Sequence, residues 1–153
     1  MEARVLHELQ GRRTFVVVLR TGEEVLRELR AFAGRQKIVA AQFTAIGALS
    51  DAVLAYFDWE KQDYQSSPVR RQVEVVSLVG ELAGGRSLRI HAILAGREGT
   101  ALAGYLTQAH VRPKLEVTIN ATLRHSRKIH DPEGERALID LNPATGSSAL
   151  LQP

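Results

Sequence analysis

The chain has 153 residues, an ordinary apolar share of 44% and a formal net charge of +3, which fits one globular domain and argues against a wholly disordered chain. It contains no cysteine, which excludes disulfides, Cys-ligated metal sites and thiol catalysis and favours a reducing, cytoplasmic location. The N-terminus is charged and no segment reaches the length of about 18 apolar residues that a transmembrane helix needs. We therefore expect neither a signal peptide nor a membrane partner.

The first part of the chain predicts a strand followed by one helix. The β-branched run at 15–19 is typical of a buried strand. Thr21 and Glu24 then have the spacing of a capping box, in which two side chains satisfy free amides at a helix start. Apolar residues recur at helical spacing as far as Gly34, a plausible C-cap. We expect an amphipathic helix over about 22–33 whose buried stripe is Val25, Leu26, Leu29, Phe32 and Ala33.

The rest of the chain predicts strands. Apolar or alternating patterns indicate them at 39–46, 52–59, 73–79, 88–94 and 115–123. In the third of these, Val73, Val75, Ser77 and Val79 are expected on one face. The polar segment 60–68 is typical of a loop, and the glycines of 83–86 predict a hairpin turn.

These elements predict an α+β fold in which the helix packs on one mixed, mostly antiparallel sheet. One domain is expected over 1–141. Residues 142–153 contain Pro, Gly and Ser without periodicity, and we interpret them as a loose C-terminal tail.

Several segments also resemble one family when they are taken in order. They are the helix start at 22–24, FTAIGAL at 43–49, VEVVSLVG at 73–80, LRIHAIL at 88–94, AGYL at 103–106 and PKLEV at 113–117. Together they resemble a stand-alone prokaryotic member of the PPC (plants and prokaryotes conserved) domain family, over about 12–141. The resemblance implies a homotrimer and a DNA-binding role, the latter by analogy with plant members that carry an added AT-hook. The Arg-Gly-Arg-Pro core of an AT-hook is absent from this sequence.

The same resemblance draws attention to a polar cluster around one histidine. In many prokaryotic members the HxH and GGH segments could gather three histidines, but here these positions are Arg89, His91 and Tyr105. One imidazole beside an arginine does not make a metal site, so we expect no metal and no cofactor. Two interpretations stay open for the cluster: a ligand-binding or weak acid–base site, or a charge-satisfied network at a subunit interface. Its predicted members are Glu74, Arg89, His91, Tyr105 and Glu116.

The densest basic run lies at 124–128, where Arg124, Arg127 and Lys128 are candidate phosphate contacts. The alternative is a solvated strand end whose charges are offset by Asp131, Glu133 and Glu135. Phe57 and Trp59 could stack on bases, although strand aromatics more often serve packing.

No phosphate-binding loop, dinucleotide fingerprint or nucleophile elbow occurs in the sequence. The leading functional prediction is therefore a non-catalytic, DNA-binding module of PPC type. The alternatives are a small-ligand-binding or weakly catalytic protein that uses His91, and a structural trimer that scaffolds protein partners.

Overall fold

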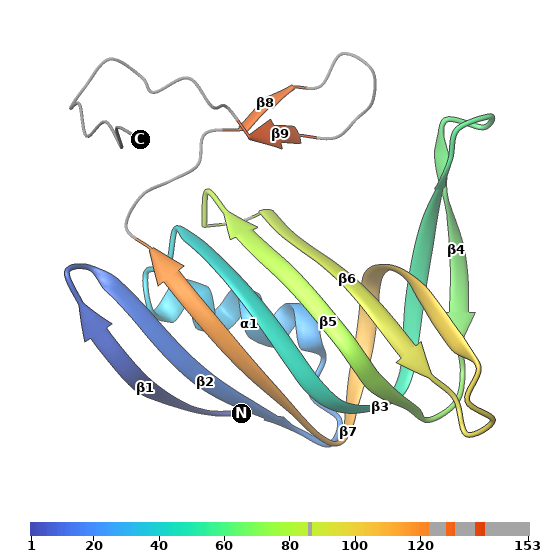
Figure 1. Cartoon of the computed structure of the whole chain (residues 1–153), viewed down its shortest axis with the longest axis horizontal. Coiled ribbons are helices and arrows are strands. Elements are labelled where there is room, and N and C mark those ends of the chain that lie inside the picture. Colours follow the sequence, from blue (N-terminus) through green and yellow to red (C-terminus); the bar gives the residue numbers. More distant parts are fainter. Residues whose placement is uncertain (86, 123–127, 131–136, 140–153) are drawn as a thin grey trace, which may run out of the picture.

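A computed structural model of the chain describes residues 1–85, 87–122, 128–130 and 137–139. Strands and one helix follow in an order that confirms the α+β class (Figure 1). The elements are β1 (Glu2–Leu9), β2 (Arg12–Arg20), α1 (Val25–Arg35), β3 (Ala40–Asp58), β4 (Asp63–Val69), β5 (Val73–Ala83), β6 (Ser87–Ala95), β7 (Ala101–Thr122), β8 (Lys128–His130) and β9 (Ala137–Ile139). Within these ranges no helix has the length and apolar character needed to cross a membrane.

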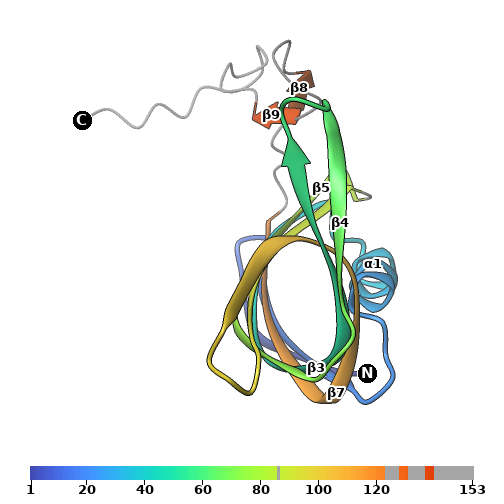
Figure 2. The ribbon, with the colours of Figure 1, turned by 90° about the vertical axis from the view of Figure 1, so that its right-hand side faces the viewer.

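The first seven strands form one sheet in the order β1-β2-β7-β6-β5-β3-β4. All of the pairings between them are antiparallel. The two longest strands, β3 and β7, also pair with each other along most of their length. Since β3 pairs with β5, β5 with β6 and β6 with β7, these four strands close a ring. The ring is the oval seen end-on in Figure 2.

The bend in β3 depends on Gly47. Its φ is +145°, and a Cβ at this position would lie 2.3 Å from the carbonyl oxygen of Lys114 on β7. The register with β5 shifts at the same place, between Ala45 and Gly47. Because glycine lets the two backbones approach this closely, β3 continues through the bend as one strand of 19 residues. The two separate strands predicted at 39–46 and 52–59 are therefore one.

Helix α1 begins later than the capping box predicted. The side chain of Glu24, not that of Thr21, caps the helix by accepting hydrogen bonds from the Leu26 and Arg27 amides at 3.2 and 2.6 Å. The Thr21 hydroxyl donates instead to the Pro113 carbonyl, and residues 21–23 belong to the turn that joins β2 to α1. The helix also continues past Gly34 to Arg35. Its predicted apolar stripe is confirmed, because all five residues are buried.

The main core lies between α1 and the inner face of the sheet. Phe15 on β2 and Phe32 on α1 meet edge to face, with ring centroids 5.2 Å apart. Both rings are at most 2% exposed, and burial of side chains this large contributes about 1.5–3 kcal/mol each. The alternation predicted for 88–94 is confirmed, since Leu88, Ile90, Ala92 and Leu94 are all buried.

In β5 the predicted alternation changes face part-way along. Val73 and Val75 are buried, but Val79 is 54% exposed. The pairing with β6 shifts register between Val75 and Ser77. Such a bulge moves every later side chain to the other face of the sheet.

Two strands of the seven-stranded sheet, β1 and β4, escape prediction because neither buries a face. All eight residues of β1 are exposed, and so are six of the seven residues of β4. The segment predicted as a loop at 60–68 is therefore mostly strand. The hairpin turn predicted at 83–86 is observed at Gly84 and Gly85, whose φ values are +60° and +68°. The predicted tail, 142–153, lies outside the described residues.

Candidate functional site

The outer face of the sheet carries two members of the predicted polar cluster in contact. His91 on β6 lies directly opposite Tyr105 on β7, with ring centroids 5.7 Å apart. The Tyr105 hydroxyl donates a hydrogen bond to the Leu88 carbonyl at 3.4 Å. His91 is exposed and Tyr105 is half-buried. The imidazole is therefore open to solvent or to a partner and is positioned by a neighbouring ring.

The other three predicted members have salt-bridge partners of their own or lie elsewhere on the sheet. Arg89 forms an ion pair with Glu81 on β5, at 2.7 Å between Nη2 and Oε1. Glu74 lies near the start of β5, whereas Glu81 lies near its end. Glu116 pairs with Lys114 at 2.6 Å. Glu116 occupies the second half of β7, which pairs with β2 and β3. Strands β3 and β5 therefore lie between Glu116 and β6, the strand that carries His91.

A ladder of aromatic rings continues from this pair into the β3–β4 hairpin. Tyr105 lies 5.9 Å from Tyr64 on β4, and Tyr64 lies 5.2 Å from Phe57 on β3. Phe57 in turn meets Trp59 edge to face at 5.1 Å. Phe57 is only 7% exposed, but Trp59 and Tyr64 are 56% and 42% exposed. These rings thus form a small second core whose outer members remain partly exposed to solvent.

A second polar network joins the bends of β3 and β7. Asp51 accepts hydrogen bonds from His110 Nδ1 and from the Ser50 hydroxyl, both at 2.7 Å. Partial burial acts to raise the pKa of Asp51, but these two hydrogen bonds and the nearby imidazole outweigh it, so the pKa lies below its usual value. The arrangement orients the imidazole of His110. The hydrogen bond from His110 to Asp51 also links β7 to β3.

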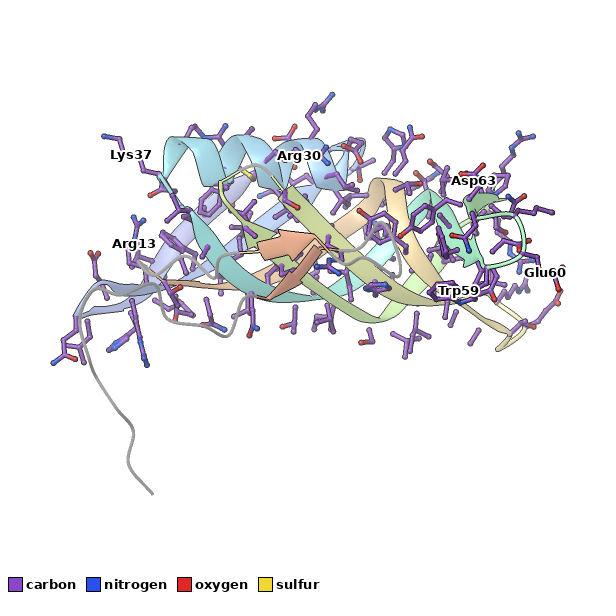
Figure 3. All side chains as sticks on the ribbon, turned by 90° about the horizontal axis from the view of Figure 1, so that it is seen from above. Arg13, Arg30, Lys37, Trp59, Glu60 and Asp63 are labelled. Atoms are coloured by element: carbon purple, nitrogen blue, oxygen red, sulfur yellow. The ribbon has the colours of Figure 1, made fainter. Side chains whose placement is uncertain are left out.

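The solvent side of α1 carries several positively charged side chains. Arg27, Arg30 and Arg35 are exposed on the helix, and Lys37 is exposed two residues beyond its end. We call these four residues the helix face. Arg27 pairs with Glu28 at 3.1 Å, whereas within the described part of the chain the other three have no carboxylate at ion-pair distance. Figure 3 shows Lys37 and Arg13 near one end of the molecule, Arg30 midway along it on the helix, and Trp59, Glu60 and Asp63 of the hairpin at the other end.

The predicted phosphate contacts cannot be placed on this surface. Arg124 and Arg127 lie outside the described residues. Lys128 begins β8, but its side chain is not described either. These three residues stay a prediction.

Comparison with known proteins now decides the family. A sequence model of the Plants and Prokaryotes Conserved domain, abbreviated PCC or PPC, matches residues 6–122. The chain belongs to this family. No curated protein matches it at a significant level.

Solved structures show that the PPC fold is shared. A "putative DNA-binding protein" from Bacteroides thetaiotaomicron aligns at 20% identity and a TM-score of 0.79, covering 90% of this chain and 96% of its own. A PPC protein from Pyrococcus horikoshii aligns at 22% identity and 0.77, covering 93% and 97%. A protein from Archaeoglobus fulgidus that is called metal-containing aligns at 27% identity and 0.73, covering 82% and 91%. At 20% and 22% identity, the likeness to the Bacteroides and Pyrococcus proteins supports the shared fold alone.

The PPC histidine positions do not suit a metal in this chain. Arg89 places a cation where a ligand would be needed, and its guanidinium is already paired with Glu81. Across the described part of the chain, no three His, Asp or Glu side chains gather closely enough to hold a metal ion. The absence of a metal stays a prediction, to be tested by elemental analysis.

Sequence reasoning missed the helix face and the Asp51–His110 network for different reasons. The helix face could have been predicted from the sequence, because the arginines at 27, 30 and 35 fall opposite the apolar stripe when the helix is drawn as a wheel. The second joins residues 59 positions apart. Only the pairing of β3 with β7 brings them together, so no local signal could have revealed it.

Proposed function

We propose that this chain is a non-catalytic PPC module that binds nucleic acid through the helix face. The observation that carries the proposal is the row of four exposed cations on and just after α1, of which only Arg27 has a carboxylate partner within the described residues. From Arg27 to Arg35 the row extends over roughly 12 Å, at 1.5 Å per helical residue, and Lys37 lies two residues beyond the helix end. Duplex DNA carries one phosphate per about 1.7 Å of axis, so a row of this length can contact several phosphates.

This mode of binding is electrostatic and does not read base sequence. Such contacts are made to the phosphate backbone and weaken steeply with salt. The positive charge near the helix C-terminus also stabilises α1 itself, because it opposes the negative end of the helix dipole. Arg124, Arg127 and Lys128 would extend the basic surface if they contact phosphate as predicted.

The test is a fluorescence-anisotropy titration of a labelled duplex at several salt concentrations. Binding that weakens steeply with salt supports the proposal, because it reports counterion release on phosphate contact. Absence of binding at low salt overturns it. The helix-face variants described in the Discussion then locate the contact.

We further propose that the outer sheet face joins copies of the chain into the homotrimer that the family resemblance implies. Four large apolar side chains stand exposed there, at 42–64% of their full accessibility, beside the His91–Tyr105 pair. They are Ile46, Val76, Val79 and Ile93. Exposed apolar side chains clustered in this way mark interaction surfaces.

A location in the cytoplasm remains expected from the absence of cysteine.

One observation favours a second function at the same face. The ring contact between His91 and Tyr105, continued by the aromatic ladder, could bind a small planar ligand. His91→Ala separates the two roles. Loss of the trimer with unchanged ligand binding indicates an interface residue, and loss of ligand binding with an intact trimer indicates a ligand site. The remaining alternative is a structural trimer that scaffolds other proteins. Such partner proteins would bind the trimer without displacing DNA.

A further inference from the structure

The turn that ends α1 has a lysine in a left-handed backbone conformation. The Ile38 amide donates to the Ala33 carbonyl at 2.9 Å, and the Lys37 amide donates to the Gly34 carbonyl at 3.2 Å. These two bonds define the Schellman motif, in which the first residue beyond the helix cap has a positive φ. That residue is Lys37, whose φ is +53°. Glycine is the usual residue at this position, because it has no Cβ to crowd the following carbonyl.

Lysine is an unfavourable choice for such a position. A left-handed backbone is disfavoured for residues with a Cβ, and asparagine and aspartate are the common exceptions. In the described part of the chain, two other residues besides glycine have positive φ: Gln10 at +49° and Gln62 at +52°. Both of these are neutral. Lys37 is therefore the charged member of the three, which makes its side chain the feature to explain.

The surroundings of Lys37 hold it in this conformation. Ile38 is only 4% exposed and lines a small apolar hollow together with Ala33, which is the contact that commonly accompanies the motif. On the other side, Arg13 donates from Nη2 to the Gln36 carbonyl at 2.8 Å. Both chain neighbours of Lys37 are thus fixed. A strained residue persists where its surroundings determine its conformation in this way.

The charge of Lys37 has no evident structural role. The side chain is exposed, and within the described residues it has no carboxylate at ion-pair distance. A cation here opposes the negative end of the helix dipole, but Arg35 in the last turn and Arg13 at the Gln36 carbonyl already supply positive charge there. Figure 3 shows Lys37 near the same end of the molecule as Arg13. Backbone strain without a structural benefit points to function.

We propose that Lys37 determines the affinity for nucleic acid, and that its charge is gained at a cost in fold stability. The inference rests on the proposed function, because the anion is the phosphate of a nucleic acid bound at the helix face. The fixed turn supports this role, since a lysine on a rigid backbone loses fewer conformations on binding a phosphate. Loss of stability at a residue that serves binding is a common trade-off.

Two variants at this position separate charge from strain. Lys37→Gln removes the charge and keeps the Cβ, whereas Lys37→Gly removes both. Anisotropy titrations with a labelled duplex should show the slope of log K against log salt reduced by about 0.9 in each variant, the contribution of one phosphate contact. Urea unfolding should show a higher midpoint for Lys37→Gly than for Lys37→Gln. Relief of the left-handed backbone should exceed the entropy that glycine adds to the unfolded chain.

A matched control relieves the same strain without a change of charge. Gln10 lies in the turn between β1 and β2 with a φ of +49°. Gln10→Gly should therefore raise the urea midpoint and leave the salt slope of DNA binding unchanged. If Gln10→Gly lowers the slope as the Lys37 variants do, the lost affinity comes from glycine or from the turn and not from the charge of Lys37, and the inference is wrong.

The outcomes distinguish this inference from the proposed function. A wild-type slope in both Lys37 variants overturns the inference, and a reduced slope in Arg30→Gln would leave the proposed function intact. Equal urea midpoints for Lys37→Gln and Lys37→Gly also overturn it, because no strain is then relieved. If the wild type binds no duplex at low salt, the proposed function fails and the role of Lys37 fails with it, whatever the urea midpoints are.

Discussion

Removal of two charges from the helix face should flatten the salt dependence of DNA binding. We choose Arg30→Gln combined with Lys37→Gln, because both side chains are exposed and neither has an ion-pair partner among the described residues. Glutamine has nearly the helix propensity of arginine, and Lys37 lies beyond the end of α1, so the change should not disturb the helix. The variant therefore tests charge rather than folding.

The expected magnitude follows from the number of contacts. Each phosphate neutralised contributes about −0.9 to the slope of log K against log salt, so four contacts give about −3.6 and two give about −1.8. Over a fourfold rise in salt, from about 50 to about 200 mM, affinity then falls about 150-fold for the wild type and only about 12-fold for the variant. Fluorescence anisotropy with one labelled duplex measures both slopes.

A matched control removes the same charges elsewhere. Lys61→Gln with Arg97→Gln also removes one lysine and one arginine, from the β3–β4 hairpin and from the β6–β7 turn. This pair should leave the slope unchanged. If it lowers the slope as much as the helix-face pair does, binding follows net charge alone, and the assignment to the helix face is wrong.

Three further outcomes are expected. The pKa of Asp51 is lowered in the folded protein, so this carboxylate stabilises the fold above its unfolded pKa, and that contribution is lost as pH falls through the lowered value. Asp51→Asn should therefore reduce the loss of stability that urea unfolding measures between about pH 5 and 2. An unchanged acid profile would contradict the His110 contact. Gly47→Ala should cost more than about 2 kcal/mol in unfolding free energy, because the new methyl group meets the β7 backbone at a residue of positive φ, and a loss below about 0.5 kcal/mol would show that the two strands are less closely packed. For the proposed trimer we expect a mass of about 50 kDa by light scattering, three times the 16.8 kDa of one chain; Val79→Asp should reduce it to that of a monomer, and a variant mass that stays near 50 kDa would place the interface elsewhere.

Sequence reasoning located the elements that bury one side. The apolar stripe of α1, the alternation of β6 and the second half of β7 were all predicted, because a half-buried helix or strand must repeat its apolar residues with the period of its backbone. β1 and β4 bury no complete face and have no such period. They were missed for that reason, since backbone pairing with a neighbour holds them in the sheet without an apolar pattern of their own.

The tertiary structure alone decided which polar residues meet. The bulge in β5 turned Val79 outward, and the length of β7 carried Glu116 away from Tyr105, although both lie on one strand. The Asp51–His110 bond and the aromatic ladder likewise depend on strand order and register. A sequence determines the period of burial along each segment because that period is local. It does not reveal which segments become neighbours, because contacts between distant strands are set by the packing of the whole chain.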